Sequence, residues 1–181
     1  MAGLVRVYIA TSADGFIAGP DDELDWLANP TPDAQVPAGV LGFEVFLAEV
    51  GAMVMGRRTY DVVRGMGGDW PYGGTPVHVR TTRMLDDAAP ATVRAVTGPI
   101  DACLDAALEV AAGRDVYVDG GATVRDALDA GRVDELIVTV VPILLGRGVP
   151  LFAGLRRRHP LRVVSHLDYG GGMVQWRYRT V

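Results

Sequence analysis

The chain has 181 residues, of which 49% are hydrophobic and 22% are charged, and this composition is typical of one globular domain over residues 1–181. The net charge of −5 and the pI near 5.1 argue against a nucleic-acid-binding surface. Because the sequence contains no Lys, we exclude a Schiff-base lysine and a Walker-type phosphate loop.

The N-terminal stretch "MAGLVRVYIATS" is typical of a first strand and not of a signal peptide. No uninterrupted apolar run approaches the roughly 18 residues that a membrane span needs. We therefore expect a cytoplasmic protein that does not bind membranes.

Runs of β-branched and aromatic residues alternate with helical patterns along most of the chain. The expected strands cover residues 4–10, 52–56, 77–82, 92–98, 115–120 and 134–144. The expected helices cover residues 40–51, 57–65, 100–113 and 122–131, with one or two further helical turns over 23–29. The longest irregular stretch, residues 65–76, is rich in Gly and Pro and is long enough to have a function.

The C-terminal tail, residues 160–181, consists of two strand-like runs joined through three glycines, which is typical of an antiparallel hairpin. The alternation of strands and helices before it indicates a mostly parallel sheet with helices on its faces. The sequence therefore predicts a three-layer α/β fold, in which a mixed, mostly parallel central sheet ends in a C-terminal antiparallel hairpin.

Two strand-to-helix junctions pass through glycine, at "VMGRRTYD" (residues 54–61) and at "VDGGATVRDAL" (residues 118–128). A helix that starts at the end of a strand offers unpaired N–H groups to an anion, and glycine lets the backbone approach it closely. Two such turns could hold the two phosphates of a dinucleotide. The alternative is tight packing alone, and the spacing does not match the G-x-G-x-x-G fingerprint. The side chains that could assist are Thr59, Thr123, Arg57 and Arg58.

The charged residues outside these turns can be interpreted either as ligand-binding or as ordinary surface and helix-capping residues. Arg80 or Arg83, at the end of a predicted strand, could bind a 2′-phosphate and favour NADPH over NADH, or could be a solvated surface residue. The acidic stretch "DDELDWL" (residues 21–27) is typical of helix capping. An acid in it that faces a cavity beside Trp26 could instead hold a polar heterocycle.

The single cysteine, Cys103, falls on the apolar face of a predicted helix, where packing explains it. The three histidines, His78, His159 and His166, are scattered and have no metal-ligand spacing. We therefore expect neither a metal site nor a catalytic triad.

Four stretches of the sequence resemble the dihydrofolate reductase superfamily: "SADGFIAGPDDELDWL", "MGRRTYD", "VDGGATVRDALDAGRVDEL" and "VPILLGRGVPLF". The similarity runs nearly from end to end. It is greatest to the C-terminal reductase domain of the bifunctional riboflavin-biosynthesis deaminase-reductase and to its stand-alone bacterial relatives. The resemblance implies a dihydrofolate reductase-like fold, NADPH as the cofactor, a small-molecule substrate and a homodimer built on the C-terminal strands.

The resemblance also implies which residues bind NADPH. They are Gly56, Arg57, Arg58 and Thr59 in the first turn, Gly120, Gly121, Ala122 and Thr123 in the second, Thr81, Thr82 and Arg83 beside the adenosine, and Ala10, Ile17 and Gly19 beside the nicotinamide.

The resemblance further implies where substrate binds. In dihydrofolate reductases an acid three positions before a Trp binds the pterin, and a Thr on a later strand supports it. Glu23 and Thr139 match these two residues, and Asp25 or Asp22 is an alternative acid. The implied catalytic residues are Glu23, Thr139 and Asp14, and the implied substrate contacts are Trp26 and Asp25.

The activity implied is hydride transfer from NADPH to a C=N or carbonyl carbon of a small heterocycle. One candidate substrate is 5-amino-6-(5-phosphoribosylamino)uracil in riboflavin biosynthesis. Dihydrofolate reductase proper is an alternative enzyme. A non-catalytic nucleotide-binding protein that retains the fold is the alternative from another functional class.

Overall fold

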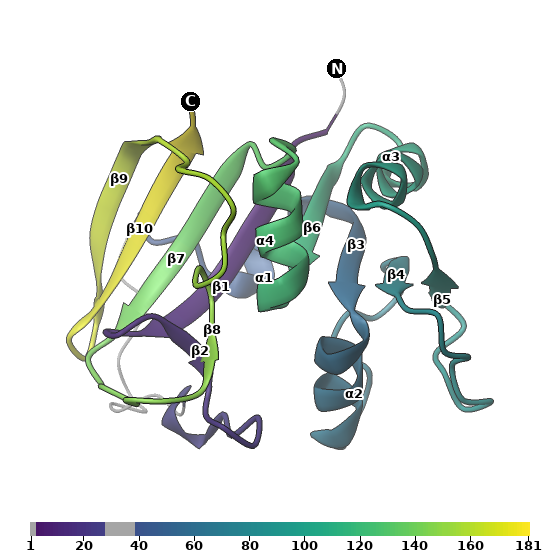
Figure 1. Ribbon diagram of the computed structural model, residues 1–181, viewed down its shortest axis with the longest axis horizontal. Coiled ribbons are helices and arrows are strands. Elements are labelled where there is room, and N and C mark those ends of the chain that lie inside the picture. The colour runs from purple at the N-terminus through teal and green to yellow at the C-terminus, as the bar shows by residue number, and fades with distance from the viewer. Residues whose placement is uncertain (1–2, 28–38) are drawn as a thin grey trace.

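An eight-stranded sheet forms the centre of the computed structural model, which describes residues 3–27 and 39–181 (Figure 1). Its strand order is β5-β4-β3-β6-β1-β7-β10-β9. The strands are β1 (Val5–Ser12), β3 (Val50–Gly56), β4 (Val77–Arg80), β5 (Val93–Val96), β6 (Asp115–Asp119), β7 (Glu135–Val141), β9 (Leu161–Gly170) and β10 (Met173–Thr180). All neighbours from β5 to β7 are parallel, and β10 pairs antiparallel with β7 and β9. The predicted fold class is confirmed.

Helices cover both faces of the sheet because its strands are apolar on both sides. Helices α3 (Ile100–Ala111) and α4 (Gly121–Asp129) pack on one face against alternate residues of the central strands. On the other face, α1 (Phe43–Glu49) and α2 (Arg57–Gly65) contribute Phe46 and Tyr60 to a second core. In Figure 1, α4 lies in front of the sheet and α1 behind it.

Several predicted elements are shorter than their sequence patterns, and for two of them the structure shows why. The helix expected over residues 40–51 begins at Phe43 and ends at Glu49, because Val50 pairs with Asp115 of β6 and continues as β3. The strand expected over 134–144 ends at Val141, because the following residue is Pro142, which has no N–H to donate. Sheet pairing overrides the helical pattern in the first case, whereas Pro142 ends the strand in the second.

Two short strands were not predicted, and they form a separate pair beside the main sheet. Strand β2 (Phe16–Ala18) pairs antiparallel with β8 (Val149–Pro150). The helical turns expected over 23–29 are a 3-10 helix at Asp25–Leu27, and residues 28 and 29 lie outside the described residues. Within the described part of the chain, no helix is both long enough and apolar enough to cross a membrane.

The hairpin edge of the sheet leaves apolar side chains in water. Leu161, Val163 and Val164 of β9 are all exposed, and the ring of His166 stacks on that of Trp176 in β10. This is the surface on which the homodimer was predicted, and the homodimer stays a prediction.

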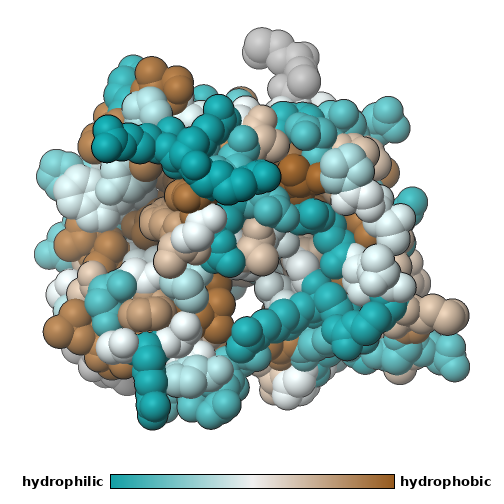
Figure 2. All heavy atoms as spheres, in the orientation of Figure 1, coloured by the Kyte–Doolittle hydropathy of each residue, from teal (hydrophilic) through white to brown (hydrophobic). Residues whose placement is uncertain are grey.

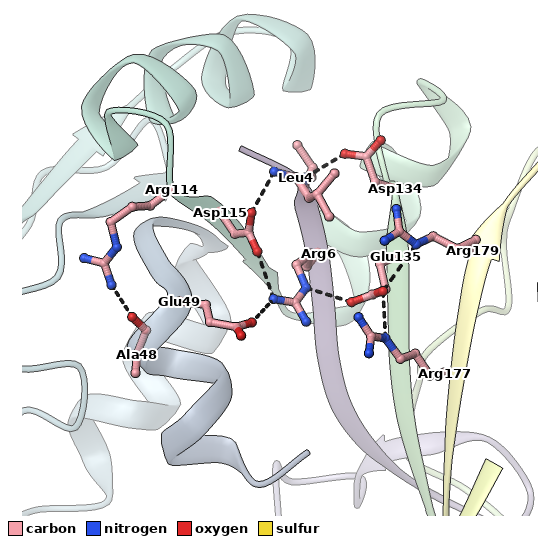
Figure 3. A network of polar contacts seen from close by, with 11 residues as sticks. Leu4, Arg6, Ala48, Glu49, Arg114, Asp115, Asp134, Glu135, Arg177 and Arg179 are labelled. Carbon is pink, nitrogen blue, oxygen red and sulfur yellow. Dashed lines mark hydrogen bonds and ion pairs between the residues drawn. The ribbon is translucent and has the colours of Figure 1, made fainter. Parts of the chain in front are cut away.

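A buried ionic cluster ties the amino ends of the central strands together (Figure 3). The Arg6 guanidinium in β1 is 3% exposed and donates to Glu135 of β7 at 2.8 Å, to Asp115 of β6 at 2.8 Å and to Glu49 of α1 at 2.5 Å. Glu135, which is fully buried, also accepts from Arg177 of β10 at 2.8 Å. The cluster therefore joins four strands and one helix.

We predict that Arg6→Met lowers the free energy of unfolding by about 3 kcal/mol, because Asp115 and Glu49 lose the guanidinium group between them and the buried Glu135 keeps only the half-exposed Arg177 and Arg179 as partners. Urea denaturation followed by circular dichroism measures the change. Arg158→Met, at an exposed position, is the control and should change stability by less than about 0.5 kcal/mol. Equal stabilities for the two variants would show that the cluster contributes nothing.

Candidate functional site

A cavity of about 790 Å³ lies where β1, β3, β4 and β6 end, the edge at which open α/β sheets bind ligands. Figure 2 shows this face hollowed at its lower centre, between β8 and α2 in the orientation of Figure 1. Twelve of the predicted cofactor-binding residues line the cavity: Ala10, Ile17, Gly56, Arg57, Arg58, Thr59, Thr81, Thr82, Gly120, Gly121, Ala122 and Thr123.

The two glycine turns pack into one another. A Cβ at Gly120 would overlap the Thr59 hydroxyl of the facing turn, and a Cβ at Gly56 would lie 3.1 Å from the Thr123 hydroxyl. Gly120 also has a φ of 87°, in the left-handed region that favours glycine. The absence of side chains at these two positions is therefore explained first by the contact between the turns.

Both turns present the start of a helix to the cavity. Gly56 caps α2 and Gly120 caps α4, and neither helix has a side-chain hydrogen bond at its N-cap. The first N–H groups of each helix remain available, and the positive ends of two helix dipoles point to one space. This arrangement fits the pyrophosphate of a dinucleotide cofactor.

The arginines at the first turn already hold carboxylates. Arg58 donates to both oxygens of Asp22, at 2.8 and 2.9 Å, across the mouth of the cavity. Arg57 donates to Asp61 at 2.7 Å and to the carbonyl of Met84 at 2.9 Å. An anion that binds here competes with Asp22 for Arg58, so these contacts moderate the positive potential of the turn.

The far end of the cavity is lined by the end of β4. Thr81, Thr82 and Arg80 face it, and Arg80 pairs with Asp126 at 2.8 Å. Arg83 does not line the cavity; it is exposed and reaches toward Asp61 at 3.4 Å. Of the two arginines proposed from the sequence for a 2′-phosphate, the structure thus brings Arg80 to the cavity.

Gly19 also lies off the cavity wall. A Cβ there would overlap the Glu23 carboxylate, which folds back over Gly19 and accepts a hydrogen bond from the N–H of Asp21 at 3.3 Å. Trp26 donates its ring N–H to the Glu23 carbonyl at 3.2 Å. Glu23, the acid that was predicted to bind the substrate, thus makes its contacts within its own loop.

The structure does not bring Glu23, Asp25 or Trp26 to the cavity, and their functional roles stay predictions. The neighbouring residues Asp22, Leu24 and Leu27 line it instead. Leu24 and Leu27 are three residues apart, which is one turn of a 3-10 helix, so the turn at Asp25–Leu27 places both on the side of the cavity.

Thr139 and Asp14 also have structural partners outside the cavity. The buried Thr139 hydroxyl accepts from the Gln175 amide at 3.4 Å. The Asp14 carboxylate accepts from the N–H groups of Leu145 and Gly146 at 3.1 and 2.7 Å, which fastens the loop before β8 to the end of β1. Their catalytic roles likewise stay predictions.

An acid that the sequence reasoning missed, Asp119, lines the cavity at the end of β6. Burial raises the pKa of its carboxyl, although the N–H of Gly120 and the hydroxyls of Tyr117 and Tyr72 act in the opposite direction. The signal that could have found it is its place in "VDGG", directly before the second glycine turn. A carboxyl that holds its proton to higher pH than usual is suited to donate it to a bound substrate.

No group of three His, Cys, Asp or Glu side chains that could hold a metal ion occurs among residues 3–27 and 39–181. The polar groups that line the cavity are Thr hydroxyls, Arg guanidinium groups, the carboxyls of Asp22 and Asp119, and helix N–H groups.

Comparison with known proteins shows which family this chain resembles. The model of the RibD C-terminal domain matches residues 4–175. The YwjB protein of Bacillus subtilis (strain 168) is 32% identical over 165 residues, which are 91% of each chain. A crystal structure from Shewanella sp. PV-4, of a protein named for riboflavin biosynthesis, has a TM-score of 0.85 and 34% identity over 100% of this chain and 99% of that one.

A more distant structure shows the same fold. Dihydrofolate reductase from Enterococcus faecalis, complexed with NADP(H) and RAB-propyl, has a TM-score of 0.66 over 99% of this chain and 98% of that one. Its sequence identity is 16%, so the likeness is one of fold.

We predict that Gly120→Ala lowers the free energy of unfolding by about 2 kcal/mol, because it adds a Cβ at a left-handed φ and against Thr59. Chemical denaturation measures the loss. Adding Thr59→Ala to this variant should recover the part due to the overlap. Gly65→Ala, at an uncrowded helical glycine, is the control and should not destabilise the chain; a similar loss in both would contradict the interlocked turns.

Proposed function

The chain belongs to the RibD C-terminal domain family, and we propose that it is an NADPH-dependent reductase of a small heterocyclic or carbonyl compound. Family membership confirms the resemblance found in the sequence. The observation that carries the proposal is the convergence of two uncapped helix N-termini and four arginines on one cavity at the carboxyl edge of the sheet. The fold is shared with a dihydrofolate reductase solved with NADP(H).

In this proposal the two glycine turns hold the pyrophosphate, with the Arg57 and Arg58 guanidinium groups beside it. Thr81, Thr82 and Arg80 at the end of β4 hold the adenosine part and its 2′-phosphate. The remaining wall, near Ala10 and Ile17 of β1 and β2, receives the nicotinamide. These assignments follow the family resemblance, and the chemistry of the residues at the two glycine turns supports the first of them.

The reaction adds a hydride to the carbon of a C=N or C=O bond and a proton to its nitrogen or oxygen, while NADPH is oxidised to NADP⁺. The chain's own contribution is to orient the two reactants, to exclude water and to supply the proton. Asp119 is the proposed proton donor, because it lines the cavity and its burial keeps the carboxyl protonated to higher pH than usual. Dihydrofolate and 5-amino-6-(5-phosphoribosylamino)uracil belong in the first substrate panel.

We predict that NADPH binds and that Arg58→Ala raises its dissociation constant about tenfold, because a charge-assisted contact to phosphate is lost. Titration of NADPH fluorescence with purified protein measures both values. Arg64→Ala is the matched control: it lies on the same helix, donates to the Ala88 carbonyl at 3.1 Å and does not line the cavity. If wild-type protein leaves NADPH fluorescence unchanged, the proposed function is wrong.

We predict that Asp119→Asn lowers kcat by about 100-fold and leaves the dissociation constant of NADPH within a factor of about two. In the wild type, kcat should fall as pH rises through the raised pKa of Asp119, because the carboxyl then loses the proton that it donates. The Asn variant should lack this limb of the pH profile. An unchanged profile in the variant would assign the proton to another group.

A further inference from the structure

The end of the cavity at β4 and β5 has one charged residue in its wall. The wall there is formed by the last residue of β4, the end of β5 and the residues that follow these strands: Arg80, Thr81, Thr82, Val96, Thr97 and Gly98. Within the described part of the chain, Arg80 is thus the only charged residue that this end contributes to the cavity wall. Recognition of an anion by charge at this end therefore depends on the Arg80 guanidinium.

The Arg80 guanidinium is held away from the helix starts that are assigned to the pyrophosphate. It reaches the carboxylate of Asp126 in α4 at 2.8 Å. Asp126 lies more than one helical turn after Gly121, where α4 begins. An anion bound by this guanidinium therefore does not share the position of an anion at the helix starts. In NADPH the 2′-phosphate and the pyrophosphate are likewise separate, because the ribose lies between them.

Asp126 brings a negative charge into direct contact with this one positive charge. Its side chain is 47% exposed, and among the described residues Arg80 is its only ion-pair partner. Asp126 does not itself line the cavity. It therefore acts on a bound cofactor through Arg80 and through its own electric field, and the two side chains together carry no net charge.

An acid and an arginine beside the adenosine ribose favour different cofactors. In dinucleotide-binding folds an acid accepts a hydrogen bond from the ribose 2′-OH of NADH, whereas an arginine accommodates the 2′-phosphate of NADPH. In this chain the two residue types are in contact. A 2′-phosphate that binds Arg80 comes close to the Asp126 carboxylate, and their repulsion offsets part of the attraction to the guanidinium. The uncharged 2′-OH of NADH meets no such repulsion.

The acids at the first glycine turn do not have this effect on cofactor choice. Asp22 pairs with Arg58, and Asp61 pairs with Arg57. Both arginines stand where the pyrophosphate is assigned, and NADH and NADPH have the same pyrophosphate. These two acids therefore change the binding of both cofactors alike, and the pair at Arg80 is the one that distinguishes them.

We propose that Asp126 is a specificity-determining residue, which keeps the preference for NADPH over NADH smaller than Arg80 alone would make it. This inference rests on the proposed function and deepens it, because it assigns control of cofactor choice to a residue outside the cavity wall. Asp126 acts on the cofactor through Arg80 and takes no part in the transfer of the hydride or the proton.

Asp126→Asn tests the proposal, because it removes the charge and keeps the shape of the side chain. Dissociation constants of NADPH and NADH are measured by fluorescence titration, and the preference is the NADH value divided by the NADPH value. We expect the variant to raise the preference at least about threefold by tightening NADPH binding, with NADH binding changed by less than a factor of about two. Added salt should reduce this difference from the wild type. NADH binding also shows that the variant is folded.

An unchanged or a reduced preference in Asp126→Asn overturns the proposal. An unchanged preference with both cofactors bound more tightly would mean that Arg80 contacts the pyrophosphate. A reduced preference would mean that Asp126 orients Arg80 for the 2′-phosphate and does not oppose it.

Two further variants place the effect at Arg80. Asp105→Asn is the matched control: its carboxylate pairs with Arg132 at 2.6 Å, is 63% exposed and does not line the cavity. It should leave the preference unchanged, and an increase equal to that of Asp126→Asn contradicts the proposal. Arg80→Gln should lower the preference at least about fivefold, because the charge that binds the 2′-phosphate is lost. An unchanged preference in this variant also overturns the proposal.

The same titrations separate this inference from the proposed function. If the wild type binds neither NADPH nor NADH, the proposed function is wrong and the inference is wrong with it. If the wild type binds NADPH and Asp126→Asn does not raise the preference, the inference alone is wrong.

Discussion

The ion pair between Arg6 and Glu135 sets the register on which the cavity depends. Side chains alternate between faces along a strand, so a slip of β1 by one residue would turn Arg6 into the apolar core beneath α3 and α4. A buried charge without a partner is strongly destabilising there. With the register fixed, Ala10 lies beside Thr139, and β1, β3 and β6 all reach the edge where the two glycine turns line the cavity. The ionic cluster at the amino ends of these strands thus fixes the positions of the cavity-lining residues at their carboxyl ends.

Local patterns were sufficient for the elements that carry the two glycine turns. Helix α2 starts at the predicted residue and α4 within one residue of it, because a buried strand, a glycine and an amphipathic run follow one another directly. The same reasoning could not find β2 and β8. Strands of three and two residues are too short to have a periodicity, and they form through their mutual pairing across the chain.

The sequence did not predict which acidic side chains face the cavity. The spacing to Trp26 favoured Glu23 as the acid that faces the substrate. In the structure, Glu23 folds back over Gly19, and Asp22 lines the cavity instead. Asp22 has a φ of 63°, which no sequence pattern predicted. Asp119 had a local signal in the glycines after it, but its raised pKa arises from burial by residues distant in sequence. Positions could be predicted from motifs, whereas the direction of each side chain depended on contacts between loops.

The reciprocal contact of the glycine turns has a consequence for how such a chain can evolve. Each glycine faces a threonine of the other turn, Gly120 against Thr59 and Gly56 against Thr123. A larger residue at either glycine would have to arrive together with a smaller one on the opposite turn. The cost in stability of a mutation in one of these two distant stretches therefore depends on which residue stands in the other.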